Sequence, residues 1–191
     1  KVYPLFKAEY GLYNAMIVAG CGFMSTILGG LLSDRFEKKS KMTKSYICMI
    51  GSLLGLPAIM ACTLITGNFH LSLFAMAIKY FVAECWMSPA ITMMQATVKP
   101  EDQGNIVSAH LFYLTVVGCI STVCLGQLAN VFGAAANPAV YGKLISLWSA
   151  IGYIGSIPCF WKAGKLYKKR MEELEQKAQM SSGFEGKVAP A

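Results

Sequence analysis

Long apolar segments alternate with short polar connections along the whole chain. The segments are close to the roughly 17–25 residues that an α-helix needs to cross a bilayer. A membrane β-barrel would instead show segments of about ten residues with alternating apolar and polar positions. The pattern therefore predicts an all-α, polytopic membrane helix bundle with five transmembrane helices, at residues 11–32, 46–66, 71–96, 106–132 and 144–161.

Composition supports a membrane protein over a water-soluble one. Of the 191 residues, 55% are hydrophobic and 14% are charged, whereas soluble domains have about 25% charged residues. The lipid bilayer is therefore the first expected partner. Prolines inside the spans are expected to kink helices rather than end them, because neighbouring helices satisfy the freed carbonyl groups; these are Pro57, Pro89 and Pro158.

The distribution of Lys and Arg predicts the topology. Thirteen of these residues fall in three segments, namely residues 33–45, the connection around Lys99 and the tail 162–191, whereas the opposite connections hold three. Basic connections are retained in the cytosol, so we expect a multi-pass protein with residues 1–161 as its transmembrane bundle and a basic cytoplasmic tail. The tail is expected to form a short helix that becomes disordered near Ser181. Topology explains the net charge of +7, and no nucleic-acid partner is expected.

The connection after the first span resembles the signature loop of the major facilitator superfamily (MFS). The matching positions are Gly30, Leu32, Asp34, Arg35, Lys38 and Lys39, and Glu37 stands where the family usually has glycine. This departure weakens the tight-turn part of the motif. The resemblance implies a conformational gate, in which Asp34 pairs with a helix N-terminus or an arginine. The alternative is an ordinary basic loop after a membrane span.

The resemblance also implies where the chain lies in a larger fold. Because the loop follows the second helix of each six-helix half in this family, the five spans look like helices eight to twelve of a twelve-helix transporter. The missing N-terminal helices would then be a partner. The first residue, Lys1, is expected to mark a fragment or a processed product. The N-terminal half is the alternative. The third span also resembles the Spinster-type branch of the family.

Glu84 lies near the middle of the third span, where an ionised carboxylate costs about 2.5 kcal/mol or more. It must be protonated, paired or exposed to a water-filled cavity, which suits a proton-coupling or substrate-pairing group. The alternative is a structural hydrogen bond between helices. Lys79 lies about 140° from Glu84 around the helix, so we expect it to be a poor partner for Glu84 and to snorkel or to contact the missing helices.

Three further polar residues are candidates for a substrate or proton pathway. His110 can change charge near pH 6.5, although it can equally cap a carbonyl at the interface. Asn14 and Gln127 can line a pathway or make hydrogen bonds between helices.

No motif for catalysis, metal binding or cofactor binding is recognised, so neither an enzyme, a metal nor a cofactor is expected. The preferred function is secondary transport of a small-molecule substrate by alternating access, coupled to protons as in a symporter. A non-transporting membrane scaffold or receptor-like subunit is the alternative, and a channel has less support. The sequence does not distinguish the plasma membrane from an organelle membrane.

Overall fold

A computed structural model describes residues 7–65, 68–134 and 137–185, and these residues are helical apart from short connections. Five helical segments are long and apolar enough to cross a membrane. The predicted all-α bundle with five membrane helices is thus confirmed. The elements are α1 (Lys7–Glu37), α2 (Thr43–Leu64), α3 (Phe69–Ala83), the 3-10 turn η2 (Glu84–Trp86), α4 (Met87–Thr97), the 3-10 turn η3 (Pro100–Asp102), α5 (Gln103–Val131) and α6 (Pro138–Glu185).

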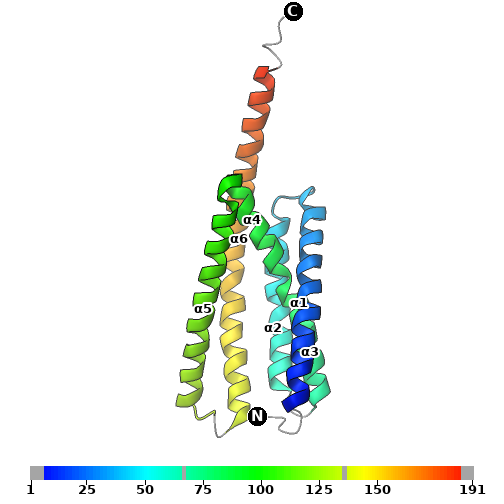
Figure 1. The fold of residues 1–191 in the computed structure, drawn as a ribbon, viewed down its shortest axis with the longest axis vertical. Coiled ribbons are helices and arrows are strands. Elements are labelled where there is room, and N and C mark those ends of the chain that lie inside the picture. Colours follow the sequence, from blue (N-terminus) through cyan, green and yellow to red (C-terminus); the bar gives the residue numbers. More distant parts are fainter. Residues whose placement is uncertain (1–6, 66–67, 135–136, 186–191) are drawn as a thin grey trace, which may run out of the picture.

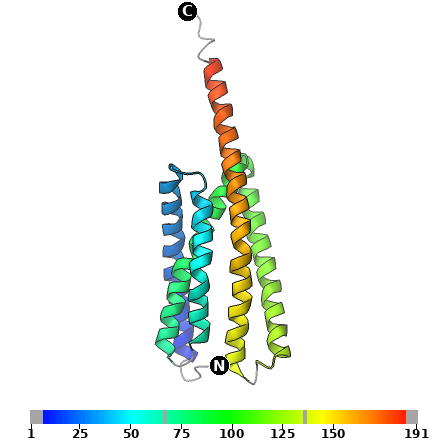
Figure 2. The same ribbon diagram turned by 180° about the vertical axis from the view of Figure 1, so that it is seen from behind.

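The helices form two groups that α4 connects. Figure 1 shows α1, α2 and α3 together on one side and α5 beside α6 on the other, and Figure 2 shows the same grouping from behind. α2 packs along α6 and joins the groups, while α4 contacts both α5 and α6.

Small and hydroxyl-bearing residues line the contact between α2 and α6. The Ser45 hydroxyl donates a hydrogen bond to the Phe160 carbonyl oxygen, and the Ser156 hydroxyl donates to Ser52 Oγ at 3.0 Å. Gly164 faces Ser45 so closely that a Cβ atom at residue 164 would overlap the serine side chain. Small residues and buried hydroxyls are the usual means by which membrane helices pack closely.

The third apolar run is two helices, whereas the sequence predicts one kinked helix. α3 ends at Ala83, η2 makes one tight turn, and α4 follows. Pro89 has no N–H group, so it cannot donate the helical hydrogen bond to the Cys85 carbonyl. That carbonyl lies against Gly29 of α1, where a side chain would overlap it. The break is therefore stabilised by contact with α1. The hydropathy of the third apolar run alone cannot show this contact.

α6 is one helix of 48 residues, about 72 Å long at 1.5 Å per residue. It extends well beyond the other helices at one end of the bundle (Figure 1). The prediction of a separate tail helix that becomes disordered near Ser181 is wrong, because the helix continues through that residue to Glu185. Residues 162–180 are rich in Lys, Glu, Ala, Leu, Gln and Met, which favour helix. Residues 162–185 contain no proline that would end the helix.

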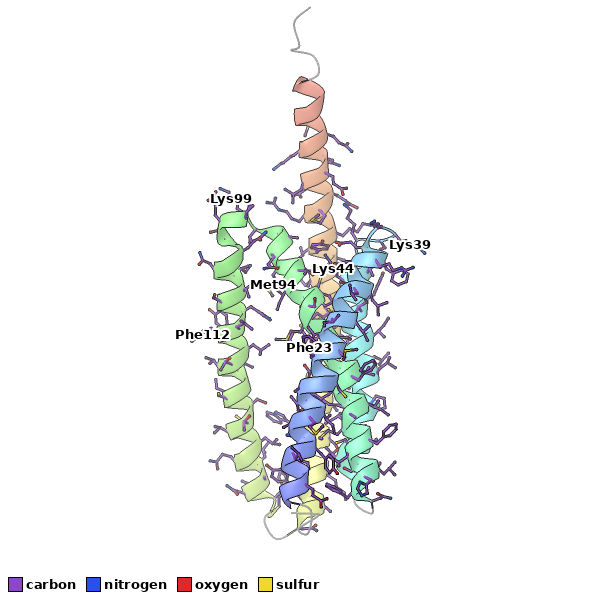
Figure 3. The ribbon with its side chains drawn as sticks, turned by 45° about the vertical axis from the view of Figure 1, so that its right-hand side comes forward. Phe23, Lys39, Lys44, Met94, Lys99 and Phe112 are labelled. Carbon is purple, nitrogen blue, oxygen red and sulfur yellow. The ribbon has the colours of Figure 1, made fainter. Side chains whose placement is uncertain are left out.

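The connections rich in Lys and Arg lie at one end of the bundle, which we call the polar end. The α1–α2 connection, the α4–α5 connection and the extension of α6 are all found there (Figure 1). Lys39 and Lys99, from two different connections, are both seen at this end in Figure 3. The arrangement agrees with the distribution of Lys and Arg, which predicts these three segments on one side of the membrane. The cytosolic location of this end stays a prediction.

Candidate functional site

The loop that resembles the MFS signature begins where α1 approaches the helix break. At Gly30, an added Cβ would lie 2.6 Å from Ser88 Oγ, and at Gly29 it would overlap the backbone of Cys85. The two glycines therefore allow α1 to contact the backbone of η2 and the start of α4. The helix that carries the polar part of the loop thus packs directly on the centre of the third membrane segment.

Four side chains from three helices meet at the polar end, and we call them the polar cluster: Asp34, Glu37, Lys44 and Tyr167. Lys44 Nζ lies 2.8 Å from Glu37 Oε2 and 3.7 Å from Asp34 Oδ1. The Tyr167 hydroxyl donates a hydrogen bond to Glu37, and its ring centre lies 5.5 Å from the Lys44 ammonium. Only 7% of the Lys44 side chain is exposed. One buried cation therefore holds α1, α2 and α6 together.

Glu37 has a different role from the one its position in the motif predicts. It is the last residue of α1, and the turn follows it, with the backbone N–H groups of Lys39 and Ser40 both donating to the Phe36 carbonyl. Where the family usually has glycine, this chain thus has an acid that ends α1 and is the closest partner of Lys44.

The basic residues of the motif lie at the surface. Arg35, Lys38 and Lys39 are exposed, and within the described part of the chain they make no ion pair. Lys41 of the same connection pairs with Glu175 on the α6 extension. The α1–α2 connection thus contacts α6 through Lys41, and the start of α2 contacts it through Lys44. The motif includes neither lysine.

Lys79 and Glu84 form an ion pair, with 3.4 Å between Nζ and Oε1. The prediction that they are poor partners is wrong. The 140° separation applies to the backbone positions, whereas both side chains are long enough to span the rise of about 7.5 Å between them. The Lys79 ammonium also lies 3.8 Å from the centre of the Tyr80 ring. Glu84 lies halfway along the segment Phe69–Thr97, at the first residue of the break.

The remaining candidates do not gather in one place. The His110 ring on α5 contacts the Trp86 ring of the helix break at a centroid distance of 6.5 Å. Its buried Nε2 atom has no hydrogen-bond partner among the described residues. Asn14 is half-buried on α1, near the end opposite the polar cluster, and Gln127 is exposed on α5. The structure therefore brings His110 to the break and leaves Asn14 and Gln127 apart from it.

Lys44→Met should destabilise the protein by about 2 kcal/mol. Removing one partner of a fully buried ion pair costs about 3–5 kcal/mol, and the cost is lower here because 26% of Glu37 is exposed. The matched control is Lys38→Met, which removes an exposed cation from the α1–α2 connection just before α2. Thermal unfolding of the purified proteins measures the difference. Equal unfolding temperatures for the two variants would show that the polar cluster does not hold the helices together.

Five long apolar helices in one bundle define the chain as an α-helical multi-pass membrane protein. Over 166 residues the chain is 25% identical to a protein of Mycolicibacterium smegmatis described as an MFS-type efflux pump. The match covers 86% of this chain and 37% of the relative, so the chain spans little more than a third of that protein's length. The two proteins are thus distantly similar over most of this chain. No protein-family model matches the chain, and neither does any solved structure.

Proposed function

We propose that the chain supplies five helices of a proton-coupled MFS transporter that moves a small solute by alternating access. The observation that carries the proposal is an ionisable pair, Lys79 and Glu84, at the break in the third membrane segment. Discontinuous membrane helices are a common feature of transporter binding sites near the midplane. Ionisable residues at this depth are costly and usually serve ion or substrate pathways.

Glu84 is the proposed proton carrier of this transporter. Its side chain is 31% exposed in the described chain, while that of Lys79 is 16% exposed, so the carboxylate can be reached while its partner is largely enclosed. When Glu84 takes up a proton it loses its attraction for Lys79, and the pair separates. Protonation of Glu84 would thereby break the ion pair at the helix break.

The polar cluster is the proposed gate. Its ion pairs and hydrogen bond join α1, α2 and α6 at one end of the bundle, so this end opens only when those contacts break. Gly29 and Gly30 connect the same helix, α1, to the break that carries Glu84. Rigid movement of α1 would couple the proton site to the gate.

Three of the described helices present apolar surface that the described chain leaves largely uncovered. None of the most apolar window of α5 is buried, and the buried share is 6% in α6 and 11% in α1. Large side chains such as Phe112 on α5 and Phe23 on α1 are 65% and 67% exposed, and both are labelled in Figure 3. These surfaces suit lipid and the remaining helices of a twelve-helix transporter. We propose the C-terminal half for this chain.

Transport is tested with the full-length protein in proteoliposomes that carry an internal pH-sensitive dye. A panel of amino acids, sugars and organic cations is added under an imposed pH gradient. We expect at least one solute to drive proton movement above the level of empty vesicles, and the sign of the movement reports symport or exchange. If no solute of the panel does so, and solute distribution is also unchanged, a non-transporting scaffold becomes the better explanation.

A further inference from the structure

The segment of α6 that follows Trp161 carries an asymmetric pattern of charge. Lys162, Lys165 and Lys169 lie within about 60° of one another around the helix axis at 100° per residue. All three are exposed, whereas Gly164 and Tyr167, on the opposite side of the helix, are buried. We call these three residues the lysine stripe. It faces away from the helices that Gly164 and Tyr167 contact.

The stripe begins where the apolar span ends. Trp161 is the last apolar residue before Lys162, and tryptophan is enriched at the level of lipid headgroups. The Lys165 ammonium lies 3.6 Å from the centre of the Trp161 ring, which holds the two side chains at one depth. The lysines thus stand at the boundary between hydrocarbon and water, over the first two turns outside the span.

The neighbouring cations are neutralised by acids, unlike those of the stripe. Lys168 pairs with Glu172 at 3.8 Å and Arg170 with Glu173 at 3.7 Å. Within residues 7–65, 68–134 and 137–185, no ion pair involves a lysine of the stripe. Three uncompensated positive charges on one outward face are complementary to anionic headgroups, which attract basic residues next to membrane helices.

We propose that the lysine stripe binds the headgroups of anionic phospholipids in the leaflet at the polar end. The unbroken helix from the span into the extension fixes the three ammonium groups at a constant depth and spacing. Headgroup phosphates can then contact the stripe without entering the bundle. This proposal concerns lipid binding and stands independently of transport.

Native mass spectrometry of the full-length protein tests the proposal, with titration of phosphatidylserine or phosphatidylcholine. We expect the protein to prefer phosphatidylserine. The triple variant K162Q/K165Q/K169Q should lose this preference, with affinity falling on the order of 100-fold at about a factor of five per lysine. The matched control is K168Q/R170Q/K177Q, which removes three cations off the stripe and should keep the preference. Helix content by circular dichroism checks that both variants are folded.

Several results would overturn the proposal. Equal binding of the two lipids to the unmodified protein would show that the stripe does not recognise anionic headgroups. An equal loss in the control triple variant would assign binding to overall charge rather than to the stripe. Displacement of phosphatidylserine by millimolar inorganic phosphate would show an anion site that does not require a lipid. Retained preference in folded K162Q/K165Q/K169Q would place the lipid elsewhere.

Discussion

Glu84→Gln is expected to reduce solute-driven proton flux to the level of empty vesicles, while the protein is still expressed and folded at a lower unfolding temperature. Glutamine keeps the size and hydrogen-bonding capacity of the side chain, but it can neither carry a proton nor attract Lys79, whose ammonium lies 3.4 Å from the carboxylate. The dye assay in proteoliposomes measures the flux. Glu101→Gln, at an exposed position of η3, is the matched control and should transport normally.

A structural role for Glu84 would give a different pattern. If the carboxylate only pairs with Lys79, the double variant Lys79→Met/Glu84→Gln removes both charges together and should restore transport along with thermal stability. If Glu84 carries the proton, the double variant should regain stability and remain inactive. Normal flux in the Glu84→Gln variant would exclude the residue from the mechanism.

Gly29→Ala is expected to destabilise the protein by about 1–3 kcal/mol, the usual cost of overpacking a close contact. A Cβ atom at residue 29 would overlap the carbonyl oxygen of Cys85 and approach the rest of its backbone. Backbone atoms cannot move aside as a flexible side chain can, so α1 must separate from the helix break. Thermal unfolding of the full-length protein measures the loss, and transport should fall with it.

Gly20→Ala is the control for this prediction, because it makes the same change in the same helix. No atom lies within 4 Å of the Cβ position at Gly20, and alanine favours helix by up to about 1 kcal/mol over glycine. We therefore expect unchanged or slightly raised stability. Similar destabilisation by both substitutions would mean that the contact between Gly29 and Cys85 does not determine the position of α1.

Hydropathy was sufficient to predict the five membrane helices, because bilayer thickness fixes the length of an apolar segment and this information is local in sequence. The break at Glu84 was not predictable in the same way. Proline at residue 89 indicates a freed carbonyl, but a full 3-10 turn at this point also depends on Gly29, which lies 56 positions away from Cys85 in the sequence.

The polar cluster shows the same limit. The motif directed attention to Asp34, yet Glu37 is closer to the buried Lys44, and Tyr167 completes the cluster from the last helix. In the sequence, Lys44 is one of several basic residues between 33 and 45, and nothing in that pattern marks it as the buried partner of Glu37. Its place at the boundary between the loop and the next apolar segment is the local signal that could have singled it out. The proximity of Tyr167 could not be deduced, because it depends on how α6 packs on α2.

Site-directed thiol labelling tests alternating access without knowledge of the substrate. Single cysteines replace Ser33, buried beside the polar cluster, or Asn14, near the opposite end of α1, in a cysteine-free full-length protein. A membrane-impermeant maleimide is applied from each side, with and without Glu37→Gln. We expect this substitution to open the polar end, which raises labelling at residue 33 and lowers it at residue 14. Unchanged labelling at both positions, or an increase at both, would contradict alternating access controlled by the polar cluster.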